Sequence, residues 1–188
     1  MDADFILIHK MKQGDEKAFN EFVGKYYGQI LKYCRWHCFD EEEAKDLTQE
    51  TFVRFMAGLS SYRHSGKAKN YLYTIAGNLC KNYYKKPMEI LTQDGQIMEN
   101  GAAAQGPEED ITDKVLLEWA IGKLPRDLSE VVILYYFQGL LMWEIAKVLG
   151  IGLPLVKYRL RQARNLLKKF IEMEDGKNES GSDVRKIQ

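Results

Sequence analysis

The chain has 188 residues, and its 27 Lys/Arg balance its 27 Asp/Glu, so the formal net charge is zero. With 45% hydrophobic residues it can build the cores of two small domains, which excludes a disordered protein. The three cysteines do not make a disulfide framework and favour a reducing, cytoplasmic setting, and no stretch approaches the ~18 apolar residues of a membrane span.

The zero net charge hides an uneven distribution along the chain. Residues 1–86 hold 14 Lys/Arg against 11 Asp/Glu, and residues 113–170 hold ten against five. Between them, residues 87–112 hold six Asp/Glu, no Lys/Arg and no periodic apolar pattern. We therefore predict two basic helical domains, 1–86 and 113–170, joined by a flexible acidic linker over 87–112 and followed by a disordered tail over 171–188.

Three helices are predicted in the N-terminal domain. Asp15 is placed to cap the first, in which apolar residues recur every three or four positions as far as Cys34. The run from Asp40 to Glu43 gathers acids at the start of the second, which continues to Leu59. The segment before Asp15 has only four consecutive apolar residues, so it is neither a signal peptide nor a membrane span.

The third helix, from Tyr71 to Lys86, carries a face that suits unpaired DNA. Aromatic, amide and cationic side chains share one sector of it: Tyr71, Asn78, Lys81, Asn82 and Lys85. Aromatic rings stack on unpaired bases, and Lys neutralises phosphate. An ordinary solvated face with half-buried tyrosines explains this helix equally well when it is taken alone.

The C-terminal domain is predicted to hold four helices and to end in a helix-turn-helix. Helical spacing over residues 144–149 is interrupted at Gly150-Ile151-Gly152, and a second helix begins at Pro154. That helix carries an apolar stripe and, beside it, a cationic row: Lys157, Arg161, Arg164 and Lys168. An amphipathic helix with a solvated basic face is the alternative, but the preceding helix and the glycine turn favour DNA binding.

No arrangement of residues predicts an enzyme. The sequence has no Gly-rich phosphate loop, no Ser/His/Asp order and no paired inward carboxylates, so we expect no catalytic residue, cofactor or small-molecule substrate. Cys34, His37 and Cys38 have the spacing of metal ligands on one helix, but no fourth ligand shows a matching spacing. We therefore predict no metal site, and a thiol- or zinc-responsive regulator is kept as an alternative.

Two motif sets, in order, resemble a known family. DEEEAKDLTQETFVRFMAGLSSYR and then NYLYTIAGNLCKNYYKK are similar to region 2 of the extracytoplasmic-function (ECF) sigma factors, with the patterns acid-x-A-x-D-L-x-Q-E-x-F and W-L-x-x-I-A-x-N. KLPRDLSEVVILYYFQGL and the helix-turn-helix after it resemble region 4, with L-P, E-I-A, L-G-I and V-K-x-R-L. The resemblance covers most of residues 5–86 and 113–170.

The resemblance implies an all-α, two-domain sigma factor. Such a protein binds bacterial core RNA polymerase and directs it to promoter DNA with minus 35 and minus 10 elements, and an anti-sigma factor is a further expected partner. The alternative is a dimeric helix-turn-helix repressor or activator, whose N-terminal domain would serve dimerisation or ligand binding. A repressor would not need the D-L-x-Q-E helix or the aromatic, basic helix after it.

The family's motifs imply a role for each matching position. Core-polymerase contact is implied for Asp46, Leu47, Gln49, Glu50 and Arg54. Opening and reading of the minus 10 element is implied for Tyr62, Arg63, Tyr71, Asn78, Lys81, Asn82 and Lys85. Minus 35 contact is implied for Pro154, Leu155, Lys157, Tyr158, Arg159, Arg161, Gln162 and Arg164, among which Arg159 and Arg164 are expected on phosphate.

Two positions depart from the family pattern. Tyr71 stands where the family usually has Trp, which keeps an aromatic ring but changes the wedge that opens DNA. Leu155 stands where Thr or Ser usually precedes Val156, so a hydroxyl able to cap the helix or contact phosphate is missing. The angle of the recognition helix and the promoter sequence are the properties that these departures affect.

Overall fold

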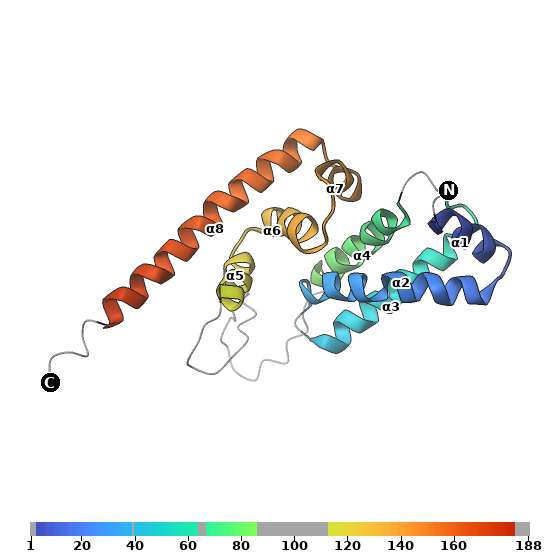
Figure 1. The fold of residues 1–188 in the computed structure, drawn as a ribbon, viewed down its shortest axis with the longest axis horizontal. Helices are drawn as coiled ribbons and strands as arrows, with labels where there is room; N and C mark the ends of the chain where they lie inside the picture. The colour runs from blue at the N-terminus through green and yellow to red at the C-terminus, as the bar shows by residue number, and fades with distance from the viewer. Residues whose placement is uncertain (1–2, 39, 64–66, 86–112, 183–188) are drawn as a thin grey trace.

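The computed structural model describes residues 3–38, 40–63, 67–85 and 113–182. Every element of secondary structure in these ranges is helical, and none of these helices has the length and apolar content that a membrane crossing requires. The helices form an N-terminal and a C-terminal group that touch each other (Figure 1). The predicted all-α, two-domain fold is confirmed, while the predicted linker, 87–112, lies outside the described residues.

The N-terminal group has four helices: α1 (Ala3–Lys12), α2 (Glu16–Arg35), α3 (Glu41–Ala57) and α4 (Ala68–Lys85). α2 packs against the other three. Phe22 of α2 and Phe55 of α3 are completely buried, and their rings stack with centroids 4.8 Å apart. As predicted, Asp15 caps α2, because its Oδ1 accepts hydrogen bonds from the backbone N–H groups of Lys17 and Ala18.

Helix α1 was not predicted from the sequence. Its Asp4 is only 3% exposed, and the carboxylate accepts hydrogen bonds from the Tyr26 hydroxyl at 2.5 Å and the Lys25 ammonium at 2.6 Å. At the other end of α1, Lys12 Nζ donates to the Tyr62 carbonyl at 2.6 Å. A buried carboxylate needs partners of this kind. Because those partners come from α2, sequence spacing within α1 did not reveal its packed face.

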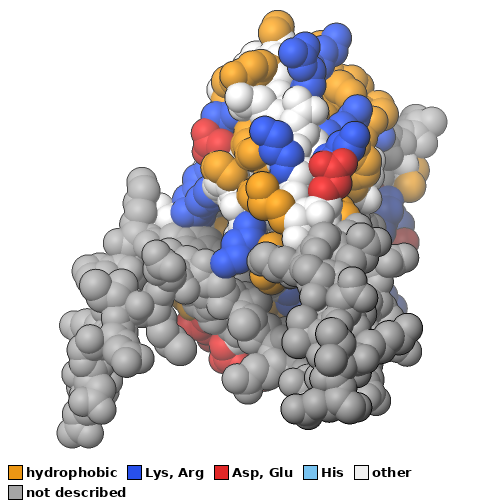
Figure 2. Space-filling model, turned by 90° about the vertical axis from the view of Figure 1, so that its left-hand side faces the viewer, with side chains coloured by type: hydrophobic (Ala, Val, Ile, Leu, Met, Phe, Trp, Pro, Cys, Tyr) orange, Lys and Arg blue, Asp and Glu red, His pale blue; other side chains and the backbone are white. Residues whose placement is uncertain are grey.

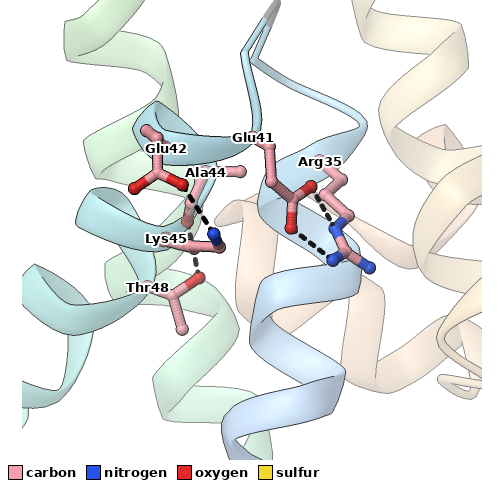
Figure 3. A network of polar contacts seen from close by, with 6 residues as sticks. All are labelled: Arg35, Glu41, Glu42, Ala44, Lys45 and Thr48. Carbon is pink, nitrogen blue, oxygen red and sulfur yellow. Dashed lines mark hydrogen bonds and ion pairs between the residues drawn. The ribbon is translucent and has the colours of Figure 1, made fainter.

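Figure 3 shows how the end of α2 meets the start of α3. Arg35 makes two parallel hydrogen bonds to the Glu41 carboxylate, the one from Nε at 2.7 Å. Glu42 pairs with Lys45 at 2.6 Å, and Thr48 Oγ1 donates to a carbonyl of its own helix at 2.7 Å. The acids at the start of α3 thus lie at the positive end of the helix dipole and help to set the direction of α3.

The C-terminal group consists of α5 (Asp113–Gly122), α6 (Arg126–Val132), the π-helical turn η1 (Ile133–Phe137), α7 (Met142–Leu149) and α8 (Leu153–Ser182). α8 packs on α5, α6 and α7 (Figure 1). Val156, Leu160 and Ala163 of α8 are buried, as the apolar stripe predicted. Gly150 has φ +65°, a conformation that glycine adopts without strain and that turns the chain sharply from α7 into α8.

Helix α8 extends beyond the predicted end of the domain. It continues to Ser182, within the segment for which a disordered tail was predicted, and residues 183–188 lie outside the described residues. Ile171 is only partly exposed, and Lys168 pairs with Glu172 one turn later at 3.6 Å. Pairs of this kind support a helix whose composition is mostly polar.

Candidate nucleic-acid interface

One side of α3 is polar and exposed. Asp46, Gln49 and Arg54 lie on it, and Arg54 Nε donates to the Glu50 carboxylate at 2.6 Å. Leu47, at the edge of this side, is partly buried against the core. Four of the five residues for which the resemblance implies polymerase contact therefore share an outward face, and Leu47 anchors the helix beneath it.

An apolar groove adjoins this face and was not predicted from the sequence. The groove, of about 430 Å³, lies between α2 and α3 and is lined mainly by aromatic and aliphatic side chains: Phe19, Asn20, Val23, Tyr27, Gln49, Phe52, Val53 and Met56. Val53 is 61% exposed, a large fraction for an apolar side chain. Val53 follows Gln49 by four residues and Glu50 by three, and this helical spacing could have placed Val53 on the same face of α3.

Helix α4 presents the polar face that its sequence predicted. Tyr71, Asn78, Lys81 and Asn82 are exposed, and helical geometry places them within one sector. Lys85 occupies a matching position in the same helix. The whole of α4 contains no Asp or Glu, so this face carries cationic, amide and aromatic groups without a carboxylate.

Tyr71 is held by aromatic contacts that lead back to the core. Its ring stacks on Tyr62 with centroids 5.0 Å apart, and Phe55 contacts both rings, at 5.5 Å from Tyr62 and 6.0 Å from Tyr71. Tyr71 nevertheless remains 38% exposed, and Arg63 is exposed directly after Tyr62. An exposed ring supported by a buried and a partly buried ring is a surface on which an unpaired base can stack.

The first turns of α8 present the predicted helix-turn-helix surface. The exposed side chains there are Pro154, Leu155, Lys157, Tyr158, Arg161 and Gln162. Figure 2, which views the molecule from the side where α8 lies, shows Lys and Arg side chains scattered among hydrophobic ones, with a few Asp and Glu side chains between them. The surface is therefore both cationic and apolar, in contrast to a uniformly solvated basic face.

Both arginines expected on phosphate have partners inside their own domain. Arg159 pairs with Asp127 of α6, and its side chain is only 20% exposed. Arg164 is exposed, but its Nε donates to the Tyr136 hydroxyl at 2.9 Å. Lys157 and Arg161 are exposed on the outward side of α8, which places them better than Arg159 for meeting DNA.

Comparison with known proteins identifies both helical groups. A family model for sigma-70 region 2 matches residues 22–88, and one for sigma-70 region 4 matches residues 114–167. The ECF RNA polymerase sigma factor SigW of Bacillus subtilis is 30% identical over 86% of this chain and 93% of its own length. The chain belongs to the ECF sigma factors of the sigma-70 family. We refer below to the two groups as region 2 and region 4.

Further relatives agree with this assignment. The RNA polymerase sigma factor YlaC of Bacillus subtilis is 34% identical over 85% of the chain and 94% of its own length. Among solved structures, CnrH in complex with the cytosolic domain of CnrY matches the fold with a TM-score of 0.70, at 22% identity over 92% of this chain and 99% of that one. The sigma factor RpoE of Bartonella quintana, solved with the anti-sigma factor NepR, has a TM-score of 0.67 at 23% identity, over 83% and 98%.

Membership of the family determines the general function. Sigma factors bind RNA polymerase and start transcription at promoters, and as a family they are initiation factors rather than enzymes. The alternative of a dimeric repressor or activator is not favoured, because region 2 and region 4 occur together and in the order that a sigma factor requires.

Regions 2 and 4 contact each other through polar side chains. α7 of region 4 packs against α4 of region 2 (Figure 1). The Glu144 carboxylate accepts from Asn70 Nδ2 and lies near Lys67 Nζ, both at 3.2 Å, and the Tyr73 hydroxyl donates to Gln138 Oε1 at 2.9 Å. These residues lie beside the exposed face of α4, so that face stays open while the two regions touch.

A second polar contact joins the end of α2 to α6. Glu130 is 7% exposed and accepts a hydrogen bond from the Tyr33 hydroxyl at 2.5 Å, while His37 Nε2 lies 3.3 Å from its other oxygen. Nearby, the rings of Trp36 and Phe137 pack with centroids 4.7 Å apart. Burial and the Glu130 charge raise the pKa of Tyr33 well above its ordinary value, so Tyr33 remains a hydrogen-bond donor.

His37 gives this contact a predictable pH dependence. Burial lowers the pKa of His37 despite the attraction of Glu130, and Arg126 lowers it further. As the pH falls through about 6.5, the unfolded chain takes up a proton that the folded chain still resists, so stability should fall. The free energy of unfolding, measured by urea denaturation, should fall between about pH 7.5 and 5.5, and we expect His37→Gln to make this fall smaller. The same substitution at exposed His9 should leave the loss unchanged; an unaltered loss in the His37 variant would contradict this account.

The cysteines bear on the metal or thiol centre considered as an alternative. Among the described residues, no three His, Cys, Asp or Glu side chains gather as metal ligands would. Cys34 and Cys80 are buried within region 2. Burial raises the pKa of Cys38 to about 12, which keeps it a thiol at neutral pH and makes it a poor nucleophile. A thiol- or zinc-responsive regulator is not favoured, because both family models that match the chain are those of sigma factors.

Proposed function

We propose that this sigma factor uses three separate surfaces to bind its three targets. α3 binds core polymerase, α4 with Tyr62 and Tyr71 holds the opened minus 10 strand, and the start of α8 reads the minus 35 duplex. The observation that supports this division is that all three surfaces are exposed while regions 2 and 4 are in contact. The protein works in the cytoplasm with no catalytic residue or cofactor of its own, and an anti-sigma factor, the kind of protein solved with RpoE, is its regulator.

α3 is proposed to dock on polymerase through its polar face together with the adjacent groove. The mixture of carboxylates, Gln49 and the exposed Val53 suits a protein partner better than the phosphate backbone, which carboxylates repel. Asp46→Ala and Gln49→Ala should each weaken co-purification with core polymerase, while changing the free energy of unfolding by less than about 0.5 kcal/mol. Glu21→Ala, at an exposed position of α2 outside the groove lining, is the control. Unchanged co-purification of both α3 variants would contradict the assignment.

Run-off transcription tests the function as a whole. Purified bacterial core polymerase is combined with this protein on the promoter of its own operon. The expected result is a specific transcript start that needs both components. If the protein gives no specific start but binds duplex DNA tightly by itself as a dimer, the repressor or activator alternative replaces the proposal.

Lys157 and Arg161 are predicted to separate base reading from phosphate binding. A side chain that contacts a base edge contributes about 1–3 kcal/mol of discrimination, whereas a phosphate contact weakens all sequences alike. Alanine at each position should therefore reduce the use of minus 35 variants unequally. Competition between holoenzymes on a set of single-base minus 35 variants measures this. A uniform loss across the set would assign the residue to phosphate.

A further inference from the structure

Two apolar side chains stand on the outward side of the first turns of α8. Leu155 is 39% exposed and Tyr158 is 55% exposed, although both belong to a helix that buries Val156 and Leu160. Leu155 and Tyr158 are three residues apart, so they are neighbours on the helix surface. Leu155 is thus neither a cap nor a core residue: it presents its aliphatic end to solvent where the family usually has a hydroxyl.

The surroundings of this pair indicate nucleic acid rather than an apolar protein surface. Lys157 and Arg161 are exposed on the same turns, and the first acidic residue of α8 is Glu172, more than four turns further on. The start of α8 is also the part of a recognition helix whose residues reach base edges in the major groove. The carboxylate that lies against these turns, that of Asp127 in α6, is paired with Arg159. Apolar side chains within such a mainly cationic surface are suited to contact DNA.

The major groove offers one apolar group on its base edges, the C5 methyl of thymine. The Tyr158 hydroxyl already accepts a hydrogen bond from Gln162 Nε2 at 2.7 Å, so its polar end is occupied while the side chain remains 55% exposed. We propose that Leu155 and Tyr158 form a thymine-methyl contact that specifies part of the minus 35 element. The proposal rests on the function proposed above and adds the chemical group that is read.

Replacing thymine by uracil removes this methyl group and changes no Watson–Crick hydrogen bond. Each thymine of the minus 35 element, located first by footprinting the holoenzyme, is replaced singly by deoxyuridine, and binding is measured by competition against the unmodified promoter. We expect about a fourfold loss at the contacted position, the loss typical of one buried methyl group. Leu155→Ser should abolish the difference between the thymine and uracil promoters, and Tyr158→Ala should reduce it.

A matched control separates this effect from a general loss of apolar surface. Leu117 of α5 is 37% exposed, an exposed fraction similar to the 39% of Leu155. Leu117→Ser therefore removes a side chain of the same kind and exposure outside α8, and it should preserve the preference for thymine. Equal binding of every uracil promoter by the unchanged protein overturns the proposal, and so does a uracil effect that persists undiminished in both α8 variants. No specific transcription from the unmodified promoter would instead refute the proposed function itself.

Discussion

Phe55→Ala should lower the free energy of unfolding by about 3–5 kcal/mol, the range for removing a large aromatic side chain from a packed core. Phe55 is completely buried, stacks on Phe22 and supports the rings of Tyr62 and Tyr71. The variant should therefore lose core stability and also loosen the aromatic surface proposed to hold the minus 10 strand. Urea unfolding measures the first effect. Formation of the open complex, followed by permanganate reactivity of unpaired thymines at a temperature where the variant is folded, measures the second.

Val53→Ala is the matched control for this prediction. Val53 lies two residues before Phe55 on the same helix but is 61% exposed, so its truncation should change the free energy of unfolding by less than about 0.5 kcal/mol. It should weaken polymerase binding if the groove belongs to that surface, and it should leave open-complex formation normal once polymerase is saturating. Equal stability losses in the two variants would contradict the burial pattern.

Glu144→Ala is expected to reduce stability by about 2–4 kcal/mol, because it removes a buried carboxylate together with the hydrogen bonds that it accepts. The Glu144 carboxylate is 1% exposed and accepts from the Leu141 N–H at 2.8 Å, which caps α7, as well as contacting Asn70 and Lys67 across the two regions. Burial alone would raise the pKa of Glu144, but the hydrogen bonds from Leu141, Asn70 and Lys67 outweigh it and lower that pKa. Thermal unfolding of the full chain checks the loss.

Two further variants help to interpret the Glu144 effect: one is a control at an exposed carboxylate, and the other tests a contact between the regions. Glu172→Ala removes an exposed carboxylate from an i, i+4 pair and should cost less than about 0.5 kcal/mol. Lys67→Ala, combined with Glu144→Ala in a double-mutant cycle, isolates the contact between regions from the cap of α7. Strict additivity in that cycle would show that the Lys67–Glu144 pair contributes nothing, which leaves the hydrogen bonds from Leu141 and Asn70 as the source of the effect.

The contact between regions 2 and 4 shows why part of this structure was not predictable. Tyr33 and Glu130 are 97 residues apart, and Tyr73 and Gln138 are 65 apart. Periodicity indicates which side of a helix is buried but not which distant helix covers it. Glu130, Glu144 and Gln138 are polar residues that a pattern assigns to solvent. Each is buried, and each accepts a hydrogen bond from a residue of the other region.

The candidate surfaces also combine features that the sequence predicted with features that depend on tertiary packing. The outward faces of α3, α4 and α8 follow from helical spacing, and the structure exposes most of the residues expected there. The groove beside Val53 needs two helices at a set distance, and the pairing of Arg159 with Asp127 needs α6 beside α8, so neither could be seen in one segment.

The sequence by itself determined the all-α class, the two regions, the helix-turn-helix and the family, because these depend on short-range spacing and on motifs that each lie within one segment. Only the tertiary structure decided that α1 is an integral helix, that α8 continues past residue 170, and that regions 2 and 4 meet through Glu130 and Glu144. The physical reason is that burial of a polar group is favourable only with its partner in place, and those partners come from distant parts of the chain.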